Sequence, residues 1–275
     1  MPGKVSSSSS STPGPGSDSD LSDESSTEPS SLAPKPKFGR RQRALELFSG
    51  AGGLSRALGE KGFAVLAYEL FDEDGCEQPE FDLSKWDVVL EVLAMLRSGM
   101  IKFVHLGTPC ESFSVLRQCF GSSTRTAQCP EGDGTCPKEV LGNRLAKHSA
   151  AVIRTALQYN IWFTLENPDR SMLWQQASIK ALSRKTDVRC IKFDQCCFGL
   201  RDPGSKKLYR KRTIIMTNIP NTDALECMCS RDHEHERVEG NVLTPDGWKS
   251  RSKLAGVYPP ALCNAIAKCA AKACK

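Results

Sequence analysis

Between residues 44 and 69, an apolar segment, a glycine-rich turn, a helical run and a second apolar segment follow one another. This succession is the strongest constraint on the fold. Residues 44–48 (ALELF) predict a buried strand, residues 54–61 a helix, and residues 64–69 (AVLAYE) another strand. A strand–helix–strand unit joined by short turns places its two strands parallel in one sheet, with a right-handed crossover. The region therefore predicts an α/β fold.

The same alternation continues towards the C-terminus. Apolar patterning predicts further strands at residues 102–106, 161–166, 188–194 and 212–217, and helices at 86–98, 138–159, 171–184 and 260–275. Residues 111–138 and 219–255 lack such patterning and are expected to be irregular. Strands that alternate with helices predict a mainly parallel sheet with helices on both faces.

The first 37 residues differ in composition from the rest of the chain. They are dominated by serine, proline and acidic residues and have too little apolar surface to offset the entropy lost on folding. We therefore expect residues 1–37 to be a disordered tail and residues 38–275 to form the folded domain. The tail is net acidic while the whole chain carries +5, so the folded part is moderately basic, which weakly favours a polyanionic partner.

The cysteine content indicates the compartment. The chain has 13 cysteines, an odd number, and its N-terminus lacks the apolar core of a secretory signal. Reduced thiols inside the cell are therefore expected, rather than a disulfide scaffold. No apolar run approaches the roughly 18 residues that a membrane span requires, so no membrane association is expected.

The glycine turn after the first strand favours a nucleotide-like ligand. Glycines allow a ligand to approach the backbone closely, and the following helix offers free N–H groups. Glu69, at the end of the next strand, is placed to accept hydrogen bonds from a ribose, and Asp82 follows where an adenine amino group would lie. A tight connection without function, with Asp82 as a helix N-terminal residue, is the alternative.

Two further polar motifs end predicted strands. Cys110 follows strand 102–106 within GTPCESFS and begins a small, polar loop, which is where open α/β sheets bind ligands. A partly exposed thiol in an electropositive setting is a nucleophile. Glu166 ends strand 161–166 within LENP and faces Cys110 if the strands are neighbours; in a desolvated site it has reason to hold a proton. A structural cysteine and an exposed acid are the alternatives.

A cluster of cations precedes strand 212–217. Arg210 and Arg212 lie in YRKR, and clustered cations at a strand start suit phosphate or base contacts. A solvated charge run explains the cluster equally well.

In this order the motifs resemble those of the cytosine C5 DNA methyltransferase family. FSGAGGLSRAL resembles its S-adenosylmethionine motif, GTPCESFS its Pro-Cys motif, LENP its Glu-Asn motif, YRKRTIIMTN its Arg-x-Arg strand and GVYPPALCNAIA the end of its last motif. The resemblance covers about residues 44–218 and 255–268. The chain departs from the family at Pro168, Leu208 and 254–256, and only residues 219–254 remain for the target-recognition insertion.

The resemblance implies a Rossmann-like S-adenosylmethionine-dependent methyltransferase fold and transfer of a methyl group to C5 of a cytosine in DNA. Cys110, Glu166 and Arg212 would be catalytic. The implied cofactor-binding residues are Phe48, Ser49, Gly50, Ala51, Gly52, Gly53, Leu54, Glu69, Leu70, Asp82, Leu83 and Pro109, and the implied substrate-binding residues are Ser112, Ser114, Asn167 and Arg210. A base in a duplex would have to be flipped out to reach such a site.

Other functions remain open. Close relatives of the family methylate a tRNA cytosine with the same motifs, and the changed last motif favours a weakly catalytic accessory protein that binds S-adenosylmethionine or DNA. An adenine amino-methyltransferase is disfavoured because residues 167–170 (NPDR) lack its second proline and its aromatic residue. With a DNA substrate in a eukaryote, the chain would act in the nucleus. The sequence does not indicate protein partners.

Cysteine and histidine residues also gather in the C-terminal irregular segment. Cys227, Cys229, His233 and His235 are donors that suit zinc. Their C-x-C and H-x-H spacing does not match small zinc folds, so a polar loop with coincidental ligands is the alternative, and no metal is the primary expectation. Cys119, Cys129 and Cys136 are weaker ligand candidates.

Overall fold

The computed structural model describes residues 42–115, 117 and 121–275. All of them belong to one compact unit, Arg40–Lys275. The expected disordered tail, residues 1–37, and the weak ligand candidate Cys119 lie outside the described residues.

The unit is built on a six-stranded sheet in the order β2-β1-β3-β4-β7-β5. Its strands are β1 (Arg43–Leu47), β2 (Ala64–Tyr68), β3 (Ile101–Leu106), β4 (Trp162–Pro168), β5 (Arg189–Asp194) and β7 (Arg212–Thr217). Strand β7 runs antiparallel to both of its neighbours, and the remaining pairs are parallel. The sheet is therefore mainly parallel, as predicted.

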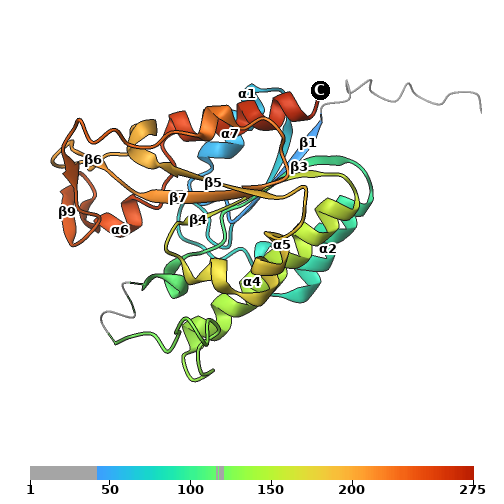
Figure 1. Ribbon diagram of the computed structural model, residues 1–275, viewed down its shortest axis with the longest axis horizontal. Helices are drawn as coiled ribbons and strands as arrows, with labels where there is room; N and C mark the ends of the chain where they lie inside the picture. The colour runs from blue at the N-terminus through green and yellow to red at the C-terminus, as the bar shows by residue number, and fades with distance from the viewer. Residues whose placement is uncertain (1–41, 116, 118–120) are drawn as a thin grey trace, which may run out of the picture. The chain divides into compact units, whose positions relative to one another are not determined.

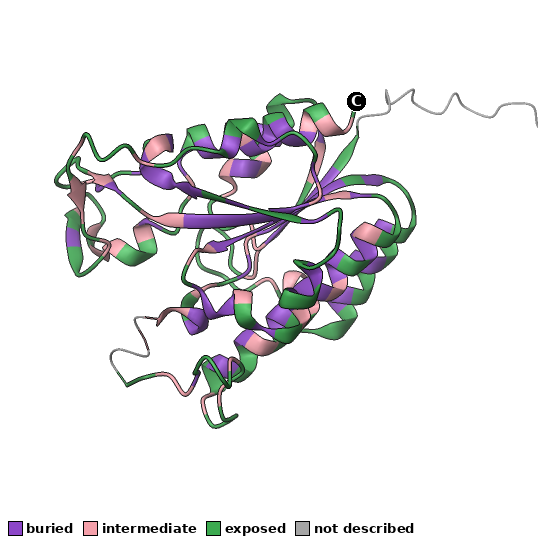
Figure 2. Cartoon of the chain, viewed as in Figure 1, coloured by how far each residue is buried: buried purple, intermediate pink, exposed green. Residues whose placement is uncertain are grey.

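Helices cover both faces of the sheet (Figure 1). Helices α1 (Gly53–Glu60) and α7 (Pro260–Ala273) lie on one face, and α2 (Trp86–Arg97), α4 (Pro137–Gln158) and α5 (Ala177–Leu182) lie on the other. Each face has its own apolar core, which Figure 2 shows as buried segments of the strands and of the inner sides of the helices. This layered arrangement is the predicted Rossmann-like fold.

The strands alternate between these two cores, and one face of the sheet also carries polar groups. Leu45 and Leu47 face the core under α2 and α4, whereas Ala44 faces the core under α1 and α7. Glu46 shares the α1 side, where it accepts a hydrogen bond from Ser55 Oγ. Buried polar residues on β3 and β4 continue this row towards the carboxyl ends of the strands, and they form the site described below.

Two sequence predictions were wrong in detail. The helix expected at 171–184 is a 3₁₀ turn, η3 (Met172–Gln175), followed by α5, because Gln176 adopts an extended ψ of 129° between them. The segment expected to be irregular, 219–255, contains short regular elements. They are η5 (Asp223–Leu225), β8 (His235–Glu236), β9 (Asn241–Thr244), β10 (Gly247–Ser250) and α6 (Arg251–Leu254).

These short elements form two small pairings. Strands β9 and β10 make an antiparallel hairpin, and β8 pairs with β6 (Leu208–Tyr209). Three other 3₁₀ turns connect the larger elements: η1 (Pro79–Phe81), η2 (Glu111–Phe113) and η4 (Gln195–Phe198). None of the helices in the described ranges combines the length and the apolar character needed to cross a bilayer.

Burial of Glu46 predicts a pH-dependent stability. Desolvation raises the pKa of this carboxyl from 4.5 to about 7, despite the Ser55 hydrogen bond. The folded state therefore binds more protons than the unfolded state between these values, and stability falls as the pH rises through about 7. Glu46→Gln should match the native chain near pH 4.5 and exceed its unfolding free energy by up to about 3 kcal/mol above pH 7. Urea titrations at both pH values test this, and a stability difference that does not change with pH would contradict it.

Candidate active site

The strand order places the candidate site where the chain changes direction. From β1 the chain runs to β2 on one side, and then crosses to β3 and β4 on the other side. Ligands of open α/β sheets bind at the carboxyl ends of the strands at such a switch point. The glycine turn follows β1, and the GTPC motif follows β3, so both predicted motifs lie at this switch point.

The glycine turn is held in an open conformation that ordinary residues adopt rarely. Gly50 and Gly52 have φ values of 52° and 64°, and the Gly50 N–H donates to Glu69 Oε2 at 2.6 Å. Phe48 also has a positive φ, 61°, which is uncommon outside glycine and is typical of functional sites. No side chain caps the N-terminus of α1. The turn and Glu69 are thus joined by a hydrogen bond, with Ser49 and Gly53 partly exposed and Ala51 exposed.

The predicted adenine side of the turn is nearly closed. Phe48 and Leu83 line a cavity of about 10 Å³ together with residues of β1, β3, α2 and α4. Such a volume holds about one water, so an adenine would need this region to open. Asp82 directly follows η1, accepts the Ser84 N–H at 2.9 Å and lies 3.9 Å from Lys85, so its side chain makes a local turn before α2 and does not cap that helix.

The remaining cofactor candidates have mixed environments. Leu54 is a core residue of α1 and offers only its backbone to a ligand. Leu70 is partly exposed, and its carbonyl accepts the Gln78 N–H at 2.7 Å. Pro109 is exposed beside Cys110.

Cys110 is half-buried and lies immediately before η2, after the carboxyl end of β3. Burial raises the pKa of its thiol, the Lys211 charge lowers it, and the Glu166 charge raises it. The strand end can approach the glycine turn because residue 107 is a glycine. A Cβ there would lie 3.1 Å from Phe48 O and 3.2 Å from Tyr258 Oη. Because burial raises the pKa of the Cys110 thiol, this thiol is protonated near neutral pH, and Lys211 is the cation close to it.

Glu166 is the buried carboxylate of the site, only 5% exposed. Strands β3 and β4 are neighbours, which the prediction for Cys110 and Glu166 required. Tyr258 Oη donates to Glu166 Oε2 at 2.9 Å, and Lys211 Nζ lies 3.9 Å from Oε1. Within the described part of the chain, Oε1 accepts no hydrogen bond. A buried acceptor in this state usually awaits a ligand or water.

The neighbouring Asn167 ties the two strand ends together. Its Nδ2 donates to Thr108 O at 2.7 Å, two residues before Cys110, while its Oδ1 is buried without a described hydrogen-bond donor. The Asn167 amide is thus fixed through its nitrogen. Its Oδ1 is a second buried acceptor, in addition to Glu166 Oε1, without a described hydrogen bond.

Tyr258 and His105 were not predicted from the sequence. His105 is fully buried, and burial lowers its pKa to about 3, so its ring is neutral. One ring nitrogen contacts Thr164 Oγ1 at 2.8 Å, and the other contacts Tyr258 Oη at 3.2 Å. Thr164, His105, Tyr258 and Glu166 therefore form one hydrogen-bonded chain. Thr164, His105 and Tyr258 can each donate and accept a hydrogen bond. Tyr258 can therefore keep a hydrogen bond to Glu166 whether that carboxyl is charged or protonated.

The predicted catalytic Arg212 does not point at Glu166. Glu166 pairs with Ile215 of β7, and residues two apart share a side of a strand, so Lys211 lies on the Glu166 side. Arg212 instead pairs with Asp194, with contacts of 3.0 and 3.1 Å to the two carboxylate oxygens. In this structure Lys211 is the cation beside the carboxylate. Arg210 is exposed.

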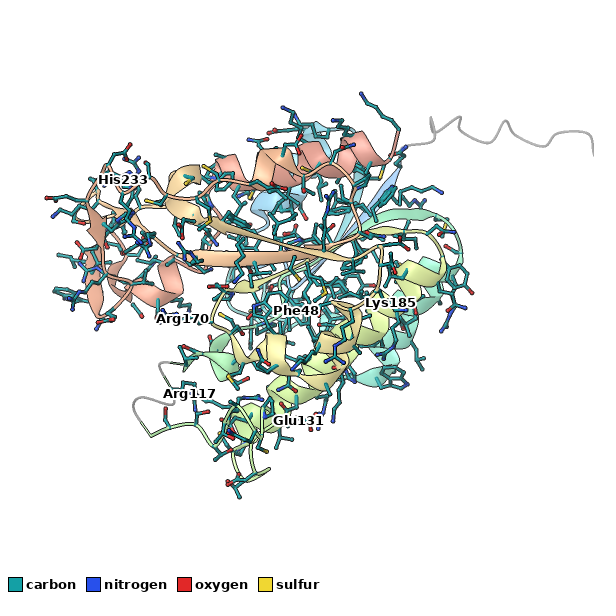
Figure 3. The ribbon with its side chains drawn as sticks, viewed as in Figure 1. Phe48, Arg117, Glu131, Arg170, Lys185 and His233 are labelled. Atoms are coloured by element: carbon teal, nitrogen blue, oxygen red, sulfur yellow. The ribbon has the colours of Figure 1, made fainter. Side chains whose placement is uncertain are left out.

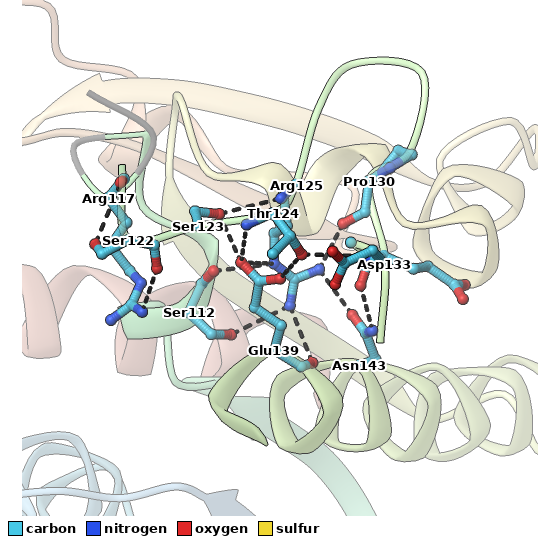
Figure 4. A network of polar contacts seen from close by, with 12 residues as sticks. Ser112, Arg117, Ser122, Ser123, Thr124, Arg125, Pro130, Asp133, Glu139 and Asn143 are labelled. Carbon is cyan, nitrogen blue, oxygen red and sulfur yellow. Dashed lines mark hydrogen bonds and ion pairs between the residues drawn. The ribbon is translucent and has the colours of Figure 1, made fainter. Parts of the chain in front are cut away.

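The segment after Cys110 is fastened to α4 (Figure 4). The Arg125 guanidinium, 2% exposed, donates to Ser112 O at 3.0 Å and to Glu139 O at 3.1 Å. The Glu139 carboxylate accepts hydrogen bonds from Ser123 and Thr124 and lies 3.9 Å from Arg125 Nε. The predicted substrate residue Ser112 is thereby buried, whereas Ser114 remains partly exposed.

The predicted metal ligands are only partly brought together. Cys229, His233 and His235 converge, and Cys196 of η4 completes the group in place of the exposed Cys227. Cys227 of the C-x-C pair therefore lies outside this group. Cys129 donates to Gly132 O and is not part of the group, and neither is Cys136. Figure 3 shows His233 near β6 and β9, far from Phe48.

No protein-family model matches the chain, and no curated protein matches it. Among solved structures, a methyltransferase of Entamoeba histolytica is similar to the chain, with 14% sequence identity over 73% of this chain and a TM-score of 0.37. This chain spans 58% of the length of that protein. At this TM-score the likeness bears on neither fold nor activity, and the fold assignment rests on the strand order and layers described above.

The Lys211 charge predicts how Cys110 reacts with an alkylating reagent. Only the thiolate reacts, and Lys211 lowers the pKa of this thiol, so Lys211→Met should move the pH–rate profile to higher pH. At about pH 8 we expect alkylation by iodoacetamide to slow roughly threefold to tenfold. Peptide mass spectrometry measures the rate at Cys110. Lys207→Met, which removes an exposed lysine paired with Glu234, is the control. An unchanged profile in Lys211→Met would place Lys211 away from the thiol.

The buried Arg125–Glu139 pair predicts a large loss of stability when one partner is neutralised. Glu139→Gln removes the nearest carboxylate charge from the buried Arg125 guanidinium and should lower the unfolding free energy by about 3–5 kcal/mol. Glu131→Gln, which breaks the exposed pair with Lys147, should cost less than about 1 kcal/mol. Denaturant titrations compare the two variants, and equal losses would show that the buried pair contributes no more than a surface pair.

Proposed function

We propose that this chain transfers a methyl group from S-adenosylmethionine to C5 of a cytosine in DNA. The observation that carries the proposal is the placement of Cys110 and Glu166 at the carboxyl ends of adjacent parallel strands, beside the switch point of the sheet. A nucleophilic thiol and a proton-donating carboxyl on neighbouring strands are the pair that addition to a pyrimidine ring requires.

The glycine turn and Glu69 fit S-adenosylmethionine as the methyl donor. Glu69 Oε2 is used by Gly50 N–H, which leaves the other carboxylate oxygen for a ribose hydroxyl. Phe48 and Leu83 would pack against the adenine once the small cavity that they line has opened. S-adenosylmethionine, when bound there, supplies the methyl group that C5 takes up.

The residues around the base would act in sequence. The Cys110 thiol passes its proton through solvent water to the Glu166 carboxylate, the Lys211 charge favours the thiolate, and the thiolate forms a bond to C6 of the ring. Glu166 presents Oε1, which accepts no hydrogen bond from the described residues, to N3 and hydrogen-bonds or protonates it, which makes C6 more electrophilic. After C5 has gained the methyl group, solvent water takes the C5 proton, the C5–C6 double bond forms again and the Cys110 thiolate leaves C6. The proton on N3 returns through Glu166 to the thiolate. The product is 5-methylcytosine, and Cys110 is regenerated.

Tyr258 and His105 would keep Glu166 ready for this exchange. Their hydrogen-bonded chain to Thr164 reverses direction when Glu166 gains a proton, so the carboxyl keeps a partner in either state. Arg212 is held by Asp194 through Nε and Nη2, and Lys211 is the cation closer to Glu166.

The polymer is the less constrained part of the proposal. A paired base cannot reach a half-buried thiol, so the cytosine must be flipped out of a duplex or presented by a single strand. We favour DNA because the motif order resembles the DNA-modifying family. Residues 219–254 would serve as a reduced target-recognition segment, and the same chemistry on a tRNA cytosine is the alternative.

The test is a mechanism-based trap. Incubation with labelled S-adenosylmethionine and oligonucleotides that contain 5-fluorocytosine should give a covalent adduct at Cys110, because fluorine cannot leave as the C5 proton does. Cys110→Ser should abolish the adduct, and Glu166→Gln should slow its formation about 100-fold or more. Cys76→Ser, which changes an exposed thiol, is the matched control and should trap normally.

DNA and RNA oligonucleotides are tested separately. An adduct with DNA supports the proposal, whereas an adduct with RNA alone replaces DNA by RNA as the substrate. If the chain binds S-adenosylmethionine but forms no adduct and transfers no methyl group to either polymer, the proposed enzymatic activity is refuted. That result would favour an accessory binding protein.

A further inference from the structure

Four metal-binding side chains from distant parts of the chain converge outside the candidate active site. Cys196 belongs to η4, directly after β5, and Cys229 and His233 lie in the segment that follows η5. His235 begins β8. Their four donor atoms all lie within 4.8 Å of one another, and Cys196 is 4% exposed.

The distances within this group fit a tetrahedral metal centre. Cys229 Sγ lies 3.4 Å from His235 Nε2 and 3.6 Å from His233 Nε2. In tetrahedral zinc sites the metal is about 2.3 Å from sulfur and about 2.0–2.1 Å from nitrogen, so a sulfur and a nitrogen ligand are roughly 3.5 Å apart. The two sulfur–nitrogen separations from Cys229 agree with this value, and the other donor atoms lie within 4.8 Å of one another.

Neighbouring groups orient the ring of His233 and donate a hydrogen bond to the sulfur of Cys229. His233 Nδ1 contacts the Asp232 carboxylate at 2.8 Å, which fixes the ring hydrogen on Nδ1 and leaves the Nε2 lone pair facing the other ligands. The backbone N–H of Arg231 donates to Cys229 Sγ at 3.3 Å and would stabilise a thiolate there. Arg231 adopts a positive φ of 64° to make this turn.

Two thiolates and two imidazoles select the type of metal. This soft donor set disfavours magnesium and calcium, which prefer oxygen ligands, and is typical of zinc. Four protein ligands fill a tetrahedral shell and leave no position for water or substrate, which distinguishes a structural site from a catalytic one.

The position of the group shows what a metal would hold. The segment from Cys227 to Ser250 contains only strands of two to four residues, which contribute little stability by themselves. It is tied to the end of β5 by Asp194, whose Oδ2 accepts the Cys229 N–H at 3.2 Å and whose backbone N–H donates to Cys227 O at 3.0 Å. A metal bound to Cys196 and to the three ligands of the segment would fasten the two regions together.

We propose that Cys196, Cys229, His233 and His235 bind one structural zinc ion, which fixes the segment 227–250 to the end of β5.

The first measurement is the metal content of the purified full-length chain. Elemental analysis should give about one zinc per chain, and replacement by cobalt should give the absorption bands of a tetrahedral Co²⁺ site with thiolate ligands. The cobalt spectrum needs only the native sequence, so it tests the ligand type even if ligand variants fail to fold. Substoichiometric metal after purification in zinc-containing buffer, or a spectrum without thiolate charge transfer, would overturn the proposal.

The chain offers matched control variants for the ligand assignment. Cys197 is adjacent to the ligand Cys196, and Cys227 lies two residues from the ligand Cys229. Cys196→Ser and His233→Ala should lose most of the bound zinc, whereas Cys197→Ser and Cys227→Ser should keep it. Zinc that is lost in Cys227→Ser and retained in Cys196→Ser would refute the ligand set and restore the pair C-x-C as the binding unit.

Discussion

Burial of the Glu166 carboxylate is the constraint on which the candidate site depends. A charged carboxyl removed from water is costly unless other groups replace its hydration. Here the replacement comes from Tyr258 and Lys211, which belong to different parts of the chain. Tyr258 lies two residues before α7 in the chain. This C-terminal helix, which packs against α1, therefore also positions the tyrosine hydroxyl that donates to Glu166. The fold and the site are therefore held together by the same contacts.

One face of the sheet concentrates the polar groups that make this possible. Glu46, His105, Thr164 and Glu166 are all buried on the side covered by α1 and α7. The opposite side of the same strands is mainly apolar and packs under α2 and α4. Along β1, β3 and β4 the buried polar groups thus gather mostly on one side of the sheet, although Asn167 of β4 and the Arg125–Glu139 pair beside α4 are buried as well. Hydrogen bonds between side chains replace much of the water lost in the polar layer.

The positions of Cys110, Glu166 and the glycine turn followed from the sequence because each ends a strand that apolar patterning reveals. Parallel strands bring their carboxyl ends to one edge, so short-range signals sufficed. The partners of Glu166 did not follow. Whether Lys211 or Arg212 faces the carboxylate depends on the pairing of β4 with β7, and a shift of one residue reverses the answer.

Contacts between distant segments were hidden for a similar reason. Cys196 joins Cys229 and two histidines through a turn that only the folded chain defines, whereas local spacing pointed to Cys227. The prediction of one helix at 171–184 was wrong at Gln176. The apolar spacing continues through this residue, although its backbone is extended. Patterning indicates which residues are buried, but not every point at which a helix is interrupted.

The opposite orientations of Lys211 and Arg212 restrict how this chain can change over evolutionary time. The connection between η4 and β7 is exposed in large part, and surface connections ordinarily tolerate insertions and deletions. An insertion or deletion of one residue that shifted β7 along its neighbouring strands would exchange the positions of Lys211 and Arg212. A guanidinium would then replace the ammonium beside Glu166, and Asp194 would lose its bidentate partner. Length variation among relatives of this protein should therefore be absent from the end of this connection and should accumulate farther from the strand.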